Sequence, residues 1–168
     1  DLPSYPHTNL SPAQFLVFLE DIDLEQGPAQ VIPGSHRGKI FDHYDDNDQW
    51  LGYIPNTHLE EIDSDNAVAL TGPAGTVTGH HGLTVHSSKQ NLSDRGRPLL
   101  ITGFNASDAL PYTAPAYPSS HHGTVIRGEQ TRYAHLEPAP IRLPPDWSGG
   151  YTSIFSHQTG AGEQLTTG

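Results

Sequence analysis

The chain of 168 residues contains no cysteine and no methionine, and only eight of its residues are Lys or Arg. Without cysteine, disulfide bonds and thiolate metal sites are excluded. Asp and Glu number 19, which gives a formal net charge of -11. An acidic surface with scattered basic residues argues against nucleic acid and anionic membrane as partners. No apolar run approaches the roughly 18 residues that a membrane-spanning helix needs.

Sustained helical periodicity is missing as well, whereas Gly (17) and Pro (15) are plentiful. Apolar, strand-like runs lie at 13–23, around Val31 and Ile32, at 68–86 and at 97–106, with turn formers between them. Many short strands with frequent turns predict an all-β protein, either a sandwich, a jelly roll or a barrel. The length suits one domain over residues 1–168.

Three smaller features carry weaker predictions. Thr57, three residues before Glu60, fits a capping box and predicts one short helix at 57–62. The acidic segment 41–50 lacks the ordered carboxylate spacing of a calcium loop, so we interpret it as a solvated loop. A short strand is expected within 140–155, with Trp147 as a packing anchor.

The first residue is Asp1, whereas translation starts with Met. We therefore expect an N-terminal portion of the domain ahead of the chain, which leaves a signal peptide open. We expect a cytoplasmic protein that acts on a small molecule. Its oligomeric state stays open.

Eleven histidines are present, and two of them stand out. His81 and His86 bound the strand-like run "HHGLTVH", five residues apart. Alternation along a strand puts residues five apart on opposite faces, so only one of the two should point inward. Spacing alone does not choose between them.

Arg97 opens the apolar strand that follows His86, across the polar turn "HSSKQNLSDRGR". We interpret this stretch as a hairpin that puts His86 and Arg97 on adjacent strands. A buried guanidinium needs a partner, and the carboxylate of a ligand, gripped by both arms of its fork, would supply one. The alternative is an exposed strand-end arginine beside Asp94.

Several of these motifs occur in a known order. "FLEDIDLEQGPAQVIPGSHRG" followed by "GTVTGHHGLTVHSSKQNLSDRGRPLLITGF" resembles the phytanoyl-CoA dioxygenase family. The resemblance covers residue 1 to about residue 106 well and the last third loosely. It implies a double-stranded β-helix, which is a jelly roll, and an oxygenase that uses Fe(II), 2-oxoglutarate and O₂.

The same resemblance implies roles for single residues. His86 would bind the metal, and Arg97, eleven residues later, would bind 2-oxoglutarate with help from Ser88. The start "DLPSYPHTN" makes Asp1 the carboxylate of a His-x-Asp metal motif whose histidine lies two residues upstream. A carboxylate at that position favours hydroxylation over halogenation. Tyr5 and His7 follow the motif and could line the substrate pocket.

The expected activity is therefore hydroxylation of a C–H bond in a small organic substrate, with release of succinate and CO₂. The eight basic residues are spread along the chain, whereas a CoA tail wants clustered positive charge, so we expect a CoA-free substrate. Two other classes remain open: a jelly-roll binding protein without turnover, and a cupin-like metal isomerase.

The proposed metal site should depend on pH. Imidazole must be neutral to bind a metal ion, so the affinity for the metal should fall below roughly pH 6.5.

Overall fold

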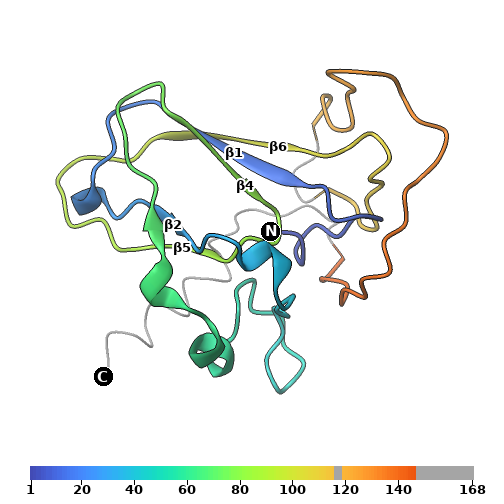
Figure 1. Ribbon diagram of the computed structural model, residues 1–168, viewed down its shortest axis with the longest axis horizontal. Coiled ribbons are helices and arrows are strands. Elements are labelled where there is room, and N and C mark those ends of the chain that lie inside the picture. The colour runs from blue at the N-terminus through green and yellow to red at the C-terminus, as the bar shows by residue number, and fades with distance from the viewer. Residues whose placement is uncertain (116–118, 147–168) are drawn as a thin grey trace. The chain divides into compact units, whose positions relative to one another are not determined.

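The computed structural model describes residues 1–115 and 119–146, and its regular elements are short strands and 3-10 helices (Figure 1). The strands form two antiparallel three-stranded sheets. An all-β protein is thereby confirmed for the described residues, which contain no α-helix. In chain order the elements are β1 Ala13–Phe18, η1 Leu24–Gln26, β2 Ala29–Val31, η2 Ser35–Arg37, η3 Asn56–Glu61, η4 Ser64–Asn66, β3 Val68–Ala69, β4 Val77–His81, β5 His86–Ser88 and β6 Leu99–Phe104.

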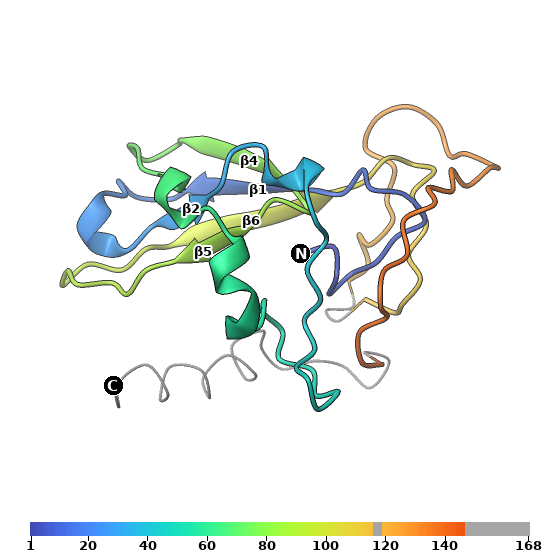
Figure 2. The same cartoon turned by 60° about the horizontal axis from the view of Figure 1, so that its bottom comes forward.

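The first sheet, which we call the long sheet, has the strand order β4-β1-β6 (Figure 2). Leu16 and Phe18 alternate along β1 and are both buried, at 6% and 2% exposure. They pack with Ile22, and Ala29 of the other sheet packs against this cluster. The core therefore lies between the two sheets, and the face of β1 that carries Leu16 is the inner face.

The opposite, outer face of the long sheet is also apolar. Phe15 and Phe104 meet there edge to face, with ring centroids 5.6 Å apart. Gly79 on β4 leaves room for the Phe15 ring, because a Cβ atom at Gly79 would lie 2.8 Å from it. The sequence therefore needs a glycine in the middle of this strand.

The second sheet, the short sheet, has the order β3-β2-β5, and none of its strands exceeds three residues. His86 stands opposite Val31, and Ser88 stands opposite Ala29. The segment before β2 turns at Gly27, whose φ is +60°. A Cβ at Gly27 would lie 2.3 Å from the carbonyl oxygen of Lys89, so this close approach of two backbones also requires glycine.

The predicted hairpin between the strands of His86 and Arg97 is wrong. β5 pairs with β2, whereas β6 pairs with β1 in the other sheet. The connection of residues 89–98 is too long for a tight turn and is fastened to the segment before β2 instead: Leu92 N–H donates to the carbonyl of Glu25 at 2.9 Å. Arg97 lies in this connection, ahead of Leu99, where β6 begins.

The capping box expected at Thr57 is also absent. A helix does form there, as η3, but it has no side-chain cap. A capping box occurs instead at η1, where Asp23 and Gln26 satisfy each other's backbone N–H groups. The strand expected within 140–155 does not form over 140–146, and Trp147 lies outside the described residues.

The chain divides into two compact units. Residues 10–40 and 63–106 form the unit that carries both sheets; residues 1–9 and 41–62, with the described part of 107–168, form the other. In the latter, Arg142 lies over the Tyr44 ring and pairs with Asp42 and Asp48, so the acidic segment is held by an arginine. The single domain over 1–168 stays a prediction. No helix among the described residues is long and apolar enough to cross a membrane.

Candidate metal site

His86 begins β5 and is held by a backbone contact. Its Nδ1 lies 2.8 Å from the carbonyl oxygen of Thr84. A carbonyl only accepts hydrogen bonds, so Nδ1 carries the proton in this contact and Nε2 keeps its lone pair. A histidine fixed in this way by a backbone carbonyl is ready to bind a metal ion through its other nitrogen.

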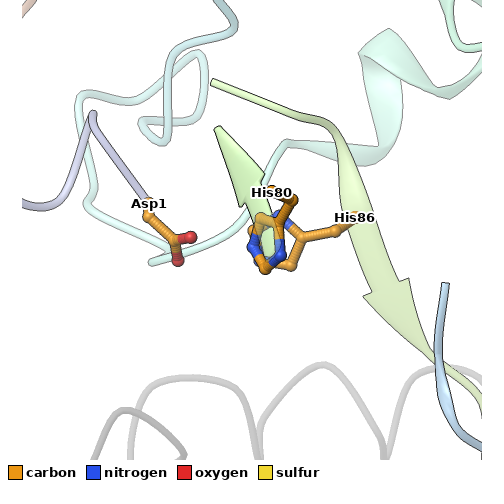
Figure 3. Close-up of side chains that lie close together, drawn as sticks. All are labelled: Asp1, His80 and His86. Atoms are coloured by element: carbon orange, nitrogen blue, oxygen red, sulfur yellow. The ribbon is translucent and has the colours of Figure 1, made fainter. Parts of the chain in front are cut away.

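His80 meets His86 from the other sheet. Its partner in the register of β4 and β1 is Gln14, two residues before Leu16, so His80 lies on the inner face of the long sheet. The ring centroids of His80 and His86 are 5.0 Å apart, at an interplanar angle of 43°. In Figure 3 the two rings overlap in the view, one in front of the other.

Sequence reasoning missed His80. The alternation argument compares only His81 with His86 and does not consider the neighbour of His81. His80 and His86 lie on separate strands in different sheets, so no spacing along one strand signals that they meet.

His81 is on the outer face of the long sheet, opposite Ala13. Its ring lies against that of His36, with centroids 5.3 Å apart. Its Nδ1 accepts a hydrogen bond from the Leu83 N–H at 3.1 Å, which stabilises the turn after β4. His81 therefore has a structural role on the face away from His86.

The pKa values of both His80 and His86 lie below the usual value of a histidine. Desolvation by the surrounding protein atoms lowers the pKa of His86 to about 4, although part of the residue is open to solvent. Desolvation also lowers the pKa of His80. Both imidazoles are therefore in the neutral, metal-binding form near pH 7.

His80 and His86 can each offer one ring nitrogen to a metal ion (Figure 3), and Asp1 carries a carboxylate of the kind that completes such a donor set. One carboxylate and two imidazoles are the donor set of non-haem Fe(II) oxygenases, so the chemistry of the donors fits this metal. His80 and His86 belong to the unit with the two sheets, and Asp1 belongs to the other unit. The part of Asp1 in a metal site is therefore a proposal, made below.

Arg97 and Arg95 come from the same connection but have different partners. Arg95 pairs with Asp23 and donates to Gln26 Oε1 at 3.2 Å. Arg97 donates from Nη1 to the backbone carbonyl of Gln26 at 3.3 Å. Among the described residues, no carboxylate forms an ion pair with Arg97, including Asp94, so its guanidinium can still take an anionic ligand.

The other predicted residues lie as follows. Ser88 ends β5 and is exposed. The backbone carbonyl oxygen of Tyr5 lies 2.7 Å from Nδ1 of His7, within hydrogen-bond distance. His7 lines a hollow of about 290 Å³ with Pro6 and Tyr112, and desolvation lowers its pKa. Tyr5 is not among the residues that line this hollow.

Comparison with known proteins gives a consistent result. A protein from Stutzerimonas stutzeri named as a probable alpha-ketoglutarate-dependent hypophosphite dioxygenase is 31% identical over 160 residues, which is 94% of this chain and 56% of that protein. L-proline trans-4-hydroxylase from Streptomyces griseoviridis is 32% identical over 110 residues, 56% of this chain and 41% of the enzyme. The chain thus spans about half the length of these curated relatives.

A solved structure and a family model agree with these relatives. The crystal structure of the epimerase SnoN in complex with Fe³⁺, alpha-ketoglutarate and nogalamycin RO matches with a TM-score of 0.55 and 25% identity, over 83% of this chain and 52% of SnoN. The family model for phytanoyl-CoA dioxygenase matches residues 1–99, which include the two facing histidines and Arg97. The chain belongs to the phytanoyl-CoA dioxygenase family.

Proposed function

We propose that this protein is an Fe(II)- and 2-oxoglutarate-dependent dioxygenase that hydroxylates a C–H bond of a small organic substrate. The observation that carries the proposal is the position of His86. Its ring centroid lies 5.0 Å from that of His80, and Nδ1 is tied to the Thr84 carbonyl, which leaves Nε2 for a metal. Membership of the phytanoyl-CoA dioxygenase family supports iron as the metal that this nitrogen would bind.

Asp1 and His86 are the proposed metal ligands, and a histidine two residues before Asp1 was the further ligand expected from the sequence. Two imidazoles and a carboxylate on one face of an ion leave positions open for a bidentate co-substrate and for O₂. When bound, Fe(II) with 2-oxoglutarate and O₂ supplies the oxidising chemistry that protein side chains lack, and the co-substrate leaves as succinate and CO₂.

Arg97 is the proposed partner of the distal carboxylate of 2-oxoglutarate. Its guanidinium has no carboxylate partner among the described residues, and its planar fork suits a carboxylate. Ser88, at the end of β5, is the proposed hydroxyl that helps hold the co-substrate. The protein thus binds and orients the co-substrate.

A jelly roll is the proposed architecture of the whole domain. The chain changes sheet between β1 and β2, between β3 and β4, between β4 and β5, and between β5 and β6. Repeated crossing between two facing sheets is how a jelly roll is wound. We propose that residues 1–168 belong to a single oxygenase domain of this type, located in the cytoplasm.

The proposed substrate is small and free of CoA. The relatives named above are called hypophosphite and L-proline oxygenases, and both substrates are small polar molecules. Tyr5 and His7 are the proposed substrate-contacting residues. His7 already lines a hollow, together with Tyr112.

Anaerobic titration of the purified protein with Fe(II) and then 2-oxoglutarate tests the proposal. A 2-oxo acid that chelates Fe(II) produces a visible charge-transfer band, and this band should appear only when both are present. Addition of O₂ should then yield succinate. Fe(II) binding without the band would favour the cupin-like isomerase, and the band without succinate for any small substrate would favour a binding protein without turnover.

A further inference from the structure

The peptide group that joins Thr84 to Val85 is held from both sides. Its carbonyl oxygen lies 2.8 Å from Nδ1 of His86 and accepts the proton of that nitrogen. Its N–H donates to the hydroxyl oxygen of Ser35 at 2.9 Å. A peptide group is planar, and its carbonyl and N–H point in opposite directions, so an anchored N–H also fixes the direction of the carbonyl. Ser35 is therefore coupled to His86 through one rigid peptide plane.

Ser35 is itself fixed by a tight turn that begins at Ile32. The Ser35 hydroxyl donates to the carbonyl of Ile32 at 2.7 Å, and the Ser35 N–H donates to the same carbonyl at 3.2 Å. Pro33 and Gly34 stand at the second and third positions, and Gly34 has a φ of +82° and a ψ of -12°, as in a type II turn. Because the hydroxyl proton is donated to Ile32, the hydroxyl oxygen is an acceptor towards Val85.

Other contacts tie the same turn to the connection between β4 and β5. The N–H of Ile32 donates to the carbonyl of Val85 at 3.0 Å, so both backbone groups of Val85 are bound by this turn. The ring of His36, the residue after the turn, lies against that of His81, with centroids 5.3 Å apart. All of these residues belong to the unit that carries both sheets. The turn thus supports the backbone from which the metal-binding histidine of β5 projects.

From these contacts we infer that Ser35 is a positioning residue for His86. It holds the Thr84 carbonyl in place, so that Nδ1 keeps its proton and Nε2 is presented to the proposed iron. The partner of the second ring nitrogen sets the tautomer and orientation of a metal-binding histidine. The inference rests on the proposed function and deepens it, because the family resemblance includes Ser35 but gives it no role.

Two substitutions of the same shape separate the effect of the hydroxyl from that of side-chain bulk. Ser35→Thr keeps a hydroxyl, and Ser35→Val replaces that hydroxyl with a methyl group. Ser11→Ala is the matched control, because the Ser11 hydroxyl also accepts a backbone N–H, from Ala106 at 3.1 Å, in the same unit. Ser35→Val and Ser11→Ala should each lower the melting temperature by roughly 2–4 °C, the effect of one hydrogen bond.

Metal affinity and the position of the ring proton are measured separately. Anaerobic Co(II) titration of the full chain should show an affinity roughly 10-fold lower in Ser35→Val, and within about twofold of the original in Ser35→Thr and Ser11→Ala. Long-range proton–nitrogen NMR spectra of the metal-free protein, assigned with His86→Asn, show which ring nitrogen of His86 carries the proton. That proton should stay on Nδ1 in Ser35→Thr and Ser11→Ala, and be divided between both nitrogens in Ser35→Val.

The possible results separate the inference from the proposed function. If either the Co(II) affinity or the position of the ring proton in folded Ser35→Val stays as in Ser11→Ala, the inference is wrong. Equal losses in Ser35→Val and Ser35→Thr also overturn it, because the hydroxyl would not be the cause. Ser35→Ala, which removes the hydroxyl without added bulk, takes the place of Ser35→Val if the latter does not fold. An unmodified protein that binds neither Co(II) nor Fe(II) overturns the proposed function and the inference together.

Discussion

The two sheets differ in what their residues do. Strands of the long sheet have five or six residues, and β1 provides the buried side chains of Leu16 and Phe18. Strands of the short sheet have two or three residues, and β5, which carries His86 and Ser88, is exposed along its length. The long sheet supplies packing, and the short sheet presents polar groups at its end. Stability and metal binding should therefore respond to different substitutions.

Removal of a core side chain from the long sheet should give the largest change in stability. Phe18 is only 2% exposed and packs in the core cluster. Phe18→Ala should lower the free energy of unfolding by roughly 3–5 kcal/mol, because it leaves a cavity between the sheets. Chemical denaturation measures this change. Leu100→Ala is the control, because Leu100 is 52% exposed in the same sheet, and it should lower the free energy of unfolding by much less. Equal losses of stability in the two variants would contradict the assignment of the core.

The short sheet should show the reverse behaviour. His86→Ala should weaken iron binding by roughly 100-fold or more and abolish succinate formation, while the free energy of unfolding changes by about 1 kcal/mol, the value of one hydrogen bond. Iron content per chain and a denaturation curve on the same sample provide the two measurements. A variant that keeps its iron would show that the metal site lies elsewhere.

The connection between β5 and β6 depends on backbone contact at Gly27. Gly27→Ala would put a methyl group against the Lys89 carbonyl, so residues 89–98 would have to move. The left-handed backbone at this position costs a non-glycine residue roughly 1–2 kcal/mol by itself, and the free energy of unfolding should fall by more than that. Gly34 has a positive φ of 82° but open space around it. Gly34→Ala should therefore show the strain alone. Thermal unfolding of both variants measures the difference, and equal shifts would mean that the close approach at Gly27 relaxes freely.

Arg97→Lys should raise the KM for 2-oxoglutarate by roughly 10-fold with the fold intact, because lysine keeps the charge but loses the bidentate fork. Arg95→Lys is the matched control in the same connection, since Arg95 already pairs with Asp23. Its KM should stay within about twofold of the original value. Equal effects in the two variants would show that Arg97 acts only by holding the connection in place.

The smallest effect concerns pH. Desolvation lowers the pKa of His86 to about 4, so in the folded protein this imidazole stays neutral well below the unperturbed value near 6.5. Metal affinity should change little between pH 7.5 and about 5 and fall steeply only near pH 4, lower than the sequence alone suggested. The unfolded chain takes up the proton first, so stability should decline as pH falls from 6.5 towards 4. Calorimetric Co(II) titrations across this range provide the test, and a midpoint at pH 6.5 would mean that the ring is solvated.

The strands were predictable because their apolar runs are short and bounded by turn formers. Val77–His81 and Leu99–Phe104 fall within the predicted segments. The pairing of the strands was not predictable in the same way. Sequence order suggests that β5 pairs with β6, which follows it, but the two strands lie in different sheets. The buried Gln26 side chain ties the connection between them to the segment before β2. His80 was missed because its orientation depends on the register with Gln14, a long-range property. The role of Arg97 stays a prediction.

Gln26 bears on how strongly Arg97 would bind the proposed co-substrate. Its side chain is 0% exposed, and its Nε2 donates to the Gly96 carbonyl at 2.7 Å, directly before Arg97. The backbone that carries this guanidinium is thus ordered before any anion arrives. An anion that binds there would not have to freeze a mobile loop, so little conformational entropy would be lost on association. Preorganisation of this kind would favour the proposed binding of 2-oxoglutarate by Arg97.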